Sequence, residues 1–217
     1  EHTIGGSFLF EIPGAFAALN SVDQACGELS PREAAKSSKE MTLLPVGKTI
    51  KDVLTEDEFK RLDDCIMERM GRRLSDEAMY AELGKMKPVM ISNVISLSFV
   101  MEQKPRHMIT GEGIDAYITQ MAMNKGKGVL GLETMEFQLK TLFAESIEKQ
   151  VEDLMCVVDN RDSLKALSFE LTNAYLSQDM ERIEKAMFAK LGTKCDPTPE
   201  EEDRLIFNRN KDWAEKM

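Results

Sequence analysis

Residues 111–138, which read GEGIDAYITQMAMNKGKGVLGLETMEFQ, carry the pattern that determines the fold class. The spacing of apolar residues predicts a short amphipathic helix over 114–123 and, after a Lys/Gly-rich turn, a brief apolar strand over 129–132. Glu133 stands at the end of that strand, and a second helix is predicted from Thr134 onward. Open α/β sheets place functional groups at this position, between the carboxyl end of a strand and the following helix.

Glu133 also has a purely structural interpretation. An acidic residue in the first turn of a helix is favoured by the helix dipole, so Glu133 could serve only to stabilise the helix that follows it. The residues of this stretch leave both interpretations open.

Two further polar residues fall near predicted strand ends. Residues 22–29 form a plausible short strand that ends in Gly27-Glu28, and His2 lies one strand upstream. We expect His2 to come from the end of a preceding strand that this chain lacks. One imidazole and the carboxylates of Glu28 and Glu133 are a donor set suited to Mn²⁺, Co²⁺ or Zn²⁺. No motif indicates an organic cofactor.

The composition narrows the classes of partner. The chain has 217 residues, which is enough for one large domain or two small ones, and 42% hydrophobic residues supply a core. The net charge is -10 and the pI about 4.9. Nucleic acids and anionic membranes both select a basic face, so neither is expected as a partner. No apolar run is long enough to span a bilayer, so no transmembrane segment is expected.

The cysteines show no C-x-x-C spacing, which argues against a zinc knuckle or a dithiol redox motif. Buried free thiols are the default expectation, and one oxidised pair is the alternative if the protein is exported. The chain opens abruptly at Glu1-His2 with no signal peptide, so it is expected to be a processed or trimmed product. The four cysteines are Cys26, Cys65, Cys156 and Cys195.

Most of the remaining chain is predicted to be helical. A capping box at Thr55 opens a helix that Gly71 ends, and Ser75 is predicted to cap a shorter helix. Pro88 begins an apolar helix to Met101 that is expected to be central and well buried. Further helices are predicted over 14–19, 146–158, 162–176, 179–190 and from the capping box at Thr198-Pro199 to the end.

Common catalytic motifs are absent. The chain has no P-loop, no G-x-G-x-x-G after a strand, no G-x-S-x-G and no H-E-x-x-H. Ser-His-Asp or Cys-His catalysis would have to use His2 or His107. His107 lies in the predicted loop 104–113 without an acidic or cysteine neighbour at ligand spacing, so we interpret it as an exposed structural residue.

Several motifs occur in an order that resembles the TraB/GumN family, which is related to the TIKI metalloproteases and more distantly to erythromycin esterases. The family has a G-x-x-H motif, a segment like SFLDSIPG, an acidic GEL, and then P-x-G-K-T-L-x-D-L-L-S-x-E-E-Y. It continues with a Lys-Pro pair that opens an apolar helix, G-I-D…G-K-x-V-x-G-L-E-T-x-E-x-Q, and E-R-N-x-x-M/W-A. The matching segments here are His2, 7–14, 27–29, 45–59, Lys87-Pro88, 113–115, 126–138 and 208–214.

The resemblance implies an α-rich α/β (α+β) fold, with a small central β-sheet and a large helical layer or insertion. It also implies a divalent-metal hydrolase, by analogy with the TIKI relatives a peptidase acting on a peptide or protein. Carried over by position, His2 becomes a metal ligand and Glu28 a ligand or general base. Glu133 lines the site and Arg209 stabilises developing oxyanion charge. Asp115 and Asn210 are weaker candidates: Asp115 could be only a helix-start acid, and Arg209 only a surface ion pair.

The same resemblance predicts how the chain is organised. Residues 1–217 form one domain that lacks the N-terminal strand or strands and the later G-x-x-H segment, with a helical insertion over 55–104 and a helical layer over 144–217. The resemblance also implies export to the periplasm or cell envelope. The alternatives are a non-catalytic binding or inhibitory module that acts through the helical surface, and a purely structural envelope protein.

Overall fold

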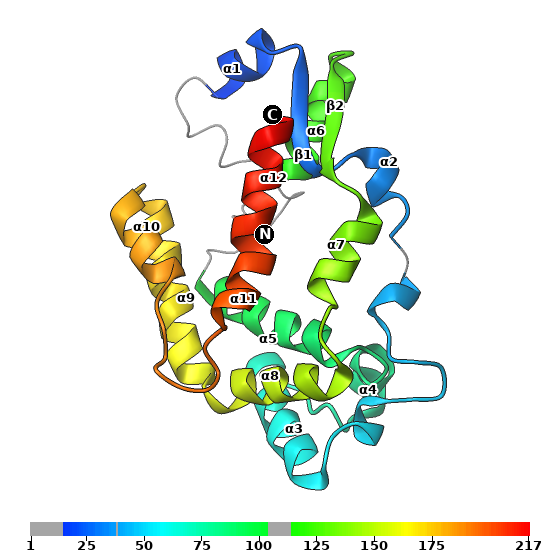
Figure 1. Cartoon of the computed structure of the whole chain (residues 1–217). Helices are drawn as coiled ribbons and strands as arrows, with labels where there is room; N and C mark the ends of the chain where they lie inside the picture. Colours follow the sequence, from blue (N-terminus) through cyan, green and yellow to red (C-terminus); the bar gives the residue numbers. More distant parts are fainter. Residues whose placement is uncertain (1–14, 38, 104–113) are drawn as a thin grey trace. The chain divides into compact units, whose positions relative to one another are not determined.

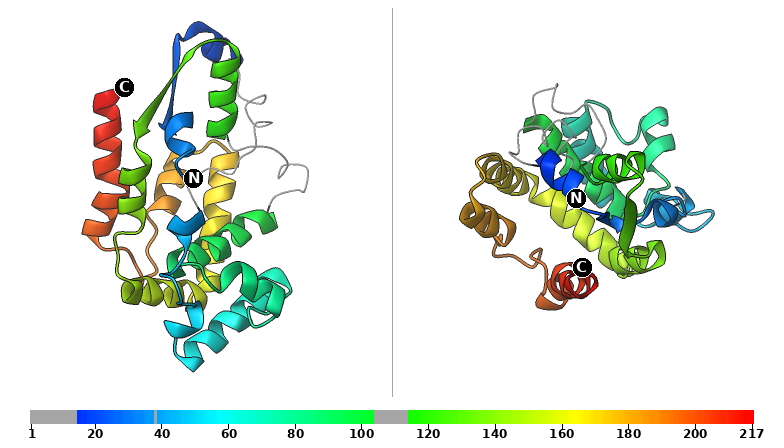
Figure 2. Two further views of the ribbon diagram at one scale, coloured as in Figure 1. Left: turned by 90° about the vertical axis from the view of Figure 1, so that its right-hand side faces the viewer. Right: turned by 90° about the horizontal axis from the view of Figure 1, so that it is seen from above.

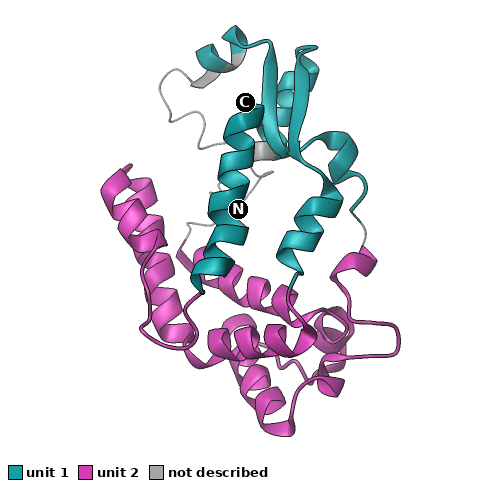
Figure 3. Ribbon diagram, in the orientation of Figure 1, with its two compact units in different colours: residues 1–38, 104–144, 198–217 teal, residues 39–103, 145–197 magenta. Residues whose placement is uncertain are grey.

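The computed structural model describes residues 15–37, 39–103 and 114–217, and these residues divide into two compact units (Figure 3). Unit 1 comprises the described residues of 1–38, 104–144 and 198–217. Unit 2 comprises 39–103 and 145–197. His2 and His107 therefore lie outside the described residues. Each unit is assembled from segments that are distant in sequence, so each one depends on long-range contacts within itself.

A two-stranded parallel sheet lies in unit 1 (Figure 1). It pairs β1, Gln24–Leu29, with β2, Gly128–Glu133, and Cys26 stands opposite Leu130 in the register. Parallel strands place both carboxyl ends at one edge of the sheet. With helices over most of the remaining described chain, this sheet confirms the α-rich α/β fold, and the two predicted strands differ from the observed ones by at most two residues.

Helices cover both faces of this sheet. Figure 2 shows α6 and α12 on opposite sides of the β1–β2 pair. Ala25 of β1, Ala122 of α6 and Leu132 of β2 are all buried, so small and branched apolar side chains fill the space between these elements. The remaining bounds in unit 1 are α1, Ala15–Ser21; α2, Pro31–Ala34; α6, Ile114–Asn124; and α7, Met135–Leu142.

The C-terminal segment of unit 1 is helical from Pro199 to Lys216 but is not uniform. The predicted capping box is confirmed: Thr198 accepts from the Glu201 amide, and the Glu201 side chain accepts from the Thr198 amide. After α11, Pro199–Glu202, the chain widens into a π-helical segment, η5, Asp203–Phe207, and then continues as α12, Asn208–Lys216. Such wide turns recur near functional sites because they change which residues share a helix face.

Unit 2 is a helical assembly with its own apolar core. Its central helix, α5, runs from Pro88 to Gln103 and buries Ile91, Ile95 and Phe99 against the neighbouring helices. The expectation of a central, well-buried helix is right for this face of α5 and wrong for the opposite one, where Leu97 and Met101 are exposed. The other helices are α3, Glu56–Met70; α4, Glu77–Leu83; α8, Ile147–Asp159; α9, Arg161–Leu176; and α10, Met180–Met187.

Local capping signals located most helix ends. Thr55 and Glu58 form the predicted capping box of α3, and Gly71 ends that helix with φ +72°, a conformation that favours glycine. Ser75 is not the cap of α4: Asp76 occupies that position, and the Ser75 amide donates to Asp63 Oδ1 at 2.7 Å. The turn between α3 and α4 is therefore fixed by a carboxylate that comes from the preceding helix.

Asp63 supplies a test of this turn. Its side chain is only 10% exposed and accepts from Arg73 Nη1 at 2.8 Å as well as from the Ser75 amide. We expect Asp63→Asn to lower the free energy of unfolding by about 1–3 kcal/mol near pH 7, because an amide at this buried position has one acceptor oxygen fewer and no charge to pair with Arg73. Urea denaturation measures this change. Asp64→Asn removes a half-exposed partner of the same arginine and serves as the control, with a smaller expected change.

The effect of Asp63 should depend on pH. Burial acts to raise the pKa of this carboxyl, but the hydrogen bonds from Arg73 and Ser75 outweigh burial and hold the pKa below its usual value. A lowered pKa gives stabilisation that is present above the unfolded-state value of about 3.9 and is lost as the pH falls through the folded-state value. The difference between wild type and Asp63→Asn should therefore shrink below about pH 4. A constant difference down to about pH 2 would contradict this explanation.

The four cysteines fall into three environments. Cys156 and Cys195 form a disulfide with their Cα atoms 5.5 Å apart. Cys65 is a buried free thiol, and burial raises its pKa to about 11. Cys26 is free and exposed. The default expectation of buried free thiols is thus right for Cys65 and wrong for the other three. Cys26 is exposed, and the pairing of Cys156 with Cys195 across 39 residues depends on the fold and not on local spacing.

The boundary between the two units divides the predicted helical layer. Residues 55–103 lie within unit 2, whereas the predicted layer over 144–217 is divided: 145–197 belong to unit 2 and 198–217 to unit 1. The C-terminal helices α11 and α12 therefore belong to the same unit as the strands. The interpretation as a single domain stays a prediction.

Candidate functional site

Two carboxylates meet at one edge of the sheet in unit 1. Glu28 is the penultimate residue of β1 and Glu133 the last residue of β2, and Leu29 stands opposite Glu133 in the parallel register. Gly131 permits the close approach of the chains at this edge, because a Cβ there would lie 2.5 Å from the Ser30 amide nitrogen. The pairing brings together acidic residues that are 105 positions apart in the numbering.

Arg209 of α12 joins the two carboxylates. Its Nε donates to Glu133 Oε1 at 2.7 Å and its Nη2 to Glu133 Oε2 at 2.9 Å, which is a bidentate pair. The same Nη2 donates to Glu28 Oε2 at 3.2 Å, and Nη1 donates to the Leu205 carbonyl at 3.3 Å. Residues from three distant segments thus form one charged cluster, which we call the Glu-Arg-Glu cluster: Glu28, Glu133 and Arg209.

Trp213 and Gln138 fix the orientation of this cluster. The Trp213 indole N–H donates to Glu133 Oε1 at 3.0 Å, and the guanidinium carbon of Arg209 lies 4.9 Å from the centre of the Trp213 ring. Gln138 Nε2 donates to Glu28 Oε2 at 2.8 Å. The indole and the amide therefore hold the two carboxylates at the positions from which they bind Arg209.

The cluster is largely shielded from water. The Glu133 side chain is 1% exposed, that of Arg209 12% and that of Glu28 25%. The hydrogen bond to Glu133 is the main cause that raises the pKa of Arg209 above its usual value. Buried ion pairs contribute little net stability compared with apolar packing, so a buried pair in a partly open site is a candidate for function.

Glu33 of α2 supports the turn that carries Glu133. Its Oε2 accepts from the Met135 amide at 3.0 Å, while Thr134 Oγ1 accepts from the Phe137 amide at 3.1 Å. The hydrogen bonds from Lys36 and from Met135 lower the pKa of the Glu33 carboxyl. Two amides at the start of α7 are therefore capped by side chains, one of them from a distant segment.

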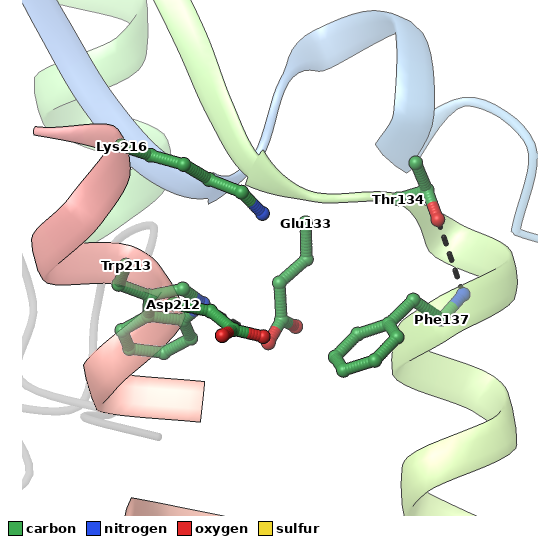
Figure 4. A pocket seen from close by; sticks show the side chains of 6 residues that line it. All are labelled: Glu133, Thr134, Phe137, Asp212, Trp213 and Lys216. Carbon is green, nitrogen blue, oxygen red and sulfur yellow. Dashed lines mark hydrogen bonds between the residues drawn. The ribbon is translucent and has the colours of Figure 1, made fainter. Parts of the chain in front are cut away.

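A pocket of about 270 Å³ adjoins the cluster within unit 1. Figure 4 shows the Glu133 side chain directed into it, with the Trp213 and Phe137 rings on either side of the carboxylate. The pocket thus borders the cluster at Glu133, and residues of α7 and α12 line it. Its lining residues are Glu133, Thr134, Phe137, Asp212, Trp213 and Lys216.

The described residues do not by themselves complete a metal site. No group of three or more His, Cys, Asp or Glu side chains suited to a metal ion occurs among them. Both oxygens of Glu133 accept from Arg209, and a guanidinium at this distance competes with a cation for the carboxylate. Two metal ligands were expected, Glu28 and His2. The structure describes Glu28, whereas His2 lies outside the described range.

The structure brings together Glu28, Glu133 and Arg209, as the analysis of strand ends and the resemblance led us to expect. Asp115 lies in the first turn of α6, and its side chain is outside what the structure describes. Asn210 follows Arg209 on α12 and is exposed. The chemical roles assigned to all of these residues stay predictions.

Sequence reasoning did not single out the groups that orient the cluster. Trp213 follows Arg209 by four positions, a spacing that places both on one face of a helix, so this signal was present in the sequence. Gln138 closes the segment over 126–138 that contains Glu133, but nothing local indicates that it binds Glu28. Glu33 gives no local signal of its contact with Met135.

Comparisons with known proteins identify the family of the chain. The model of the TraB/PrgY/gumN family matches residues 6–217. No curated protein and no solved structure matches the chain.

Proposed function

Because the chain belongs to the TraB/PrgY/gumN family, we propose that it is a metal-dependent hydrolase, of the peptidase type, whose reaction centre is the Glu-Arg-Glu cluster. The observation that carries the proposal is the position of this cluster. Three charged side chains from distant segments converge at the carboxyl ends of both strands and beside a pocket, although an isolated buried ion pair contributes little to stability.

Glu28 is the proposed general base. Its side chain is 25% exposed, whereas that of Glu133 is 1% exposed and bonded through both oxygens, so Glu28 is the carboxylate that water can reach. During hydrolysis, Glu28 takes a proton from the attacking water while the water oxygen bonds to the carbonyl carbon. The same carboxyl then gives the proton to the departing amine, which balances the reaction.

Arg209 is the proposed stabiliser of the oxyanion. A guanidinium has five N–H donors, and four of those in Arg209 are directed to Glu133, Glu28 and the Leu205 carbonyl in the described part of the chain. One N–H on Nη1 is left for a carbonyl oxygen that gains negative charge. Glu133 and Trp213 hold the guanidinium in place and are positioning residues in this scheme.

A divalent metal enters this proposal through the family resemblance. His2 would hold Mn²⁺, Co²⁺ or Zn²⁺, with Glu28 as a second ligand if it does not act as the base; when bound, the metal would lower the pKa of a water ligand and polarise a carbonyl oxygen. The roles of Glu28 and Arg209 given above use only the side chains of the chain.

Glu28→Gln tests the proposed reaction. We expect at least about a 100-fold loss in the rate at which mixed-sequence quenched peptides are cleaved, because the amide accepts no proton. Glu170→Gln, which changes a half-exposed carboxylate in unit 2, is the matched control and should leave the rate unchanged. Circular dichroism and urea denaturation of both variants show whether the fold is retained. An unchanged rate in Glu28→Gln would remove the cluster from the reaction.

A non-catalytic binding module is the second candidate, and one observation favours it. Leu176, Met180 and Met187 on α9 and α10 are 47%, 73% and 50% exposed, and exposed apolar side chains often take part in protein contacts. Metal analysis separates the candidates. If the purified protein takes up no Mn²⁺, Co²⁺ or Zn²⁺, and His2→Ala changes neither metal content nor peptide cleavage, the hydrolase proposal fails and the module is favoured.

We also propose that the protein is exported to the periplasm or cell envelope. The Cys156–Cys195 disulfide supports this location, since structural disulfides persist mainly in oxidising compartments. Among the described residues, none of the helices combines the length and apolar character needed to cross a bilayer.

A further inference from the structure

The pocket beside the Glu-Arg-Glu cluster has two aromatic walls, and one of them is held in place before anything binds. Phe137 is carried on the first turn of α7, where its amide donates to Thr134 Oγ1 at 3.1 Å, and its side chain remains 43% exposed. The opposite wall is Trp213, whose indole N–H is bound to Glu133 Oε1 (Figure 4). The Trp213 ring, held by this hydrogen bond, loses little freedom when a ligand packs against it.

The charges around the pocket give little attraction for a cationic occupant. Glu133 faces the pocket, but Arg209 binds both of its oxygens, so its charge is already compensated. The Lys216 ammonium donates a hydrogen bond to the Leu132 carbonyl. Lys216 also lines the pocket, to which its aliphatic stem adds apolar surface. Asp212 also lines the pocket but is exposed to solvent, where water weakens its attraction for a cation. The remaining attraction is that of the apolar walls.

The volume of the pocket limits the size of its occupant. Sites for whole small molecules usually enclose about 300–1,000 Å³. A pocket of about 270 Å³ is smaller and suits one large side chain. A planar ring is favoured against the Phe137 and Trp213 rings that line the pocket, since offset-stacked and edge-to-face aromatic contacts add to the effect of burial.

We infer that this pocket is a specificity subsite that accepts one bulky apolar side chain, preferably aromatic, of a peptide. The inference rests on the proposed peptidase function, because Glu133 is shared by the pocket and the Glu-Arg-Glu cluster. A peptide with such a side chain in the pocket would place its adjoining backbone near Glu133, the member of the Glu-Arg-Glu cluster that lines the pocket.

Trp213 gives a direct readout of occupancy, because it is the one tryptophan of the 217 residues. We would titrate the full chain with N-acetyl-phenylalaninamide, N-acetyl-alaninamide and N-acetyl-lysinamide while recording tryptophan fluorescence. The phenylalanine probe should shift the emission with a dissociation constant on the order of millimolar, as burial of a single ring allows. The alanine and lysine probes should bind at least about fivefold more weakly, since neither fills the apolar walls.

Phe137→Ala removes one wall and should weaken binding of the phenylalanine probe by about fivefold to tenfold. Leu142→Ala is the matched control, because Leu142 is on the same helix, is 44% exposed and does not line the pocket. Its binding should equal that of the wild type. The inference would be overturned by equal affinity for all three probes or by tighter binding of the lysine probe. It would also be overturned if Phe137→Ala and Leu142→Ala weakened binding of the phenylalanine probe equally.

Peptide cleavage distinguishes failure of this inference from failure of the proposed function. If the phenylalanine probe binds and Phe137→Ala weakens it, but no peptide is cleaved, the pocket stands as a binding site and the hydrolase proposal fails. If peptides are cleaved without preference for an aromatic residue and Phe137→Ala leaves that pattern unchanged, the hydrolase stands and the subsite is overturned.

Discussion

Arg209→Met is expected to lower the free energy of unfolding by about 3–5 kcal/mol, the effect typical of removing one partner from a buried ion pair. The Glu133 side chain is 1% exposed, so loss of the guanidinium leaves a carboxylate with almost no access to water. Trp213 would remain as a single donor to Glu133 Oε1, and the contact between Arg209 and the Trp213 ring would also be lost. Urea denaturation followed by circular dichroism measures the change.

Two controls separate this effect from the loss of any arginine. Arg182→Met removes an ion pair with Glu170 in which both side chains are nearly half exposed, and exposed pairs contribute at most about 1 kcal/mol. The double variant Glu133→Gln with Arg209→Met should recover part of the loss, because no buried charge then lacks a partner. A single-variant loss similar to that of Arg182→Met would show that the Glu-Arg-Glu cluster is solvated.

The second large effect is expected from the disulfide in unit 2. Cys156→Ser should lower the free energy of unfolding by about 3–4 kcal/mol, since the bond closes a loop of 39 residues that contains α9 and α10. A reducing agent should produce a similar loss in the wild type and none in the variant. Cys26→Ser changes an exposed free thiol and should leave stability unchanged.

Thiol labelling gives an independent check of the same bond. Under native conditions iodoacetamide should modify the exposed Cys26, whereas Cys65 is buried and its raised pKa, about 11, keeps it protonated. Unfolding without reduction should expose Cys65 and leave Cys156 and Cys195 unlabelled. Labelling of all four cysteines in unfolded, unreduced protein would contradict the pairing and remove the support for export.

The parts of the fold that depend on neighbouring residues were predictable. The capping boxes at Thr55 and Thr198 and the C-terminal Gly71 lie where the sequence placed them, because each signal and its effect are within one helical turn. The short strands were found from apolar runs next to turn residues. The cap of α4 was misplaced by one residue, since Ser75 and Asp76 both suit that position and a tertiary contact to Asp63 determined the choice.

The parts that depend on tertiary contacts were less predictable. Glu28 and Glu133 could be placed at one edge because strand ends have a general geometry, and the resemblance added Arg209. No local signal pairs Gln138 with Glu28, Glu33 with Met135, or Cys156 with Cys195. These contacts join positions 39 to 110 residues apart, so only the folded chain reveals them.

The π-helical turn over 203–207 has a consequence for how the C-terminal helix carries Arg209. Successive residues of a regular α-helix advance by about 100° around the axis, and a wider turn delays this rotation. Arg209 and Trp213 therefore point in other directions around the helix axis than they would in an unbroken α-helix that began after Thr198. The wide turn sets the direction of the guanidinium and indole separately from the capped end of the same helix.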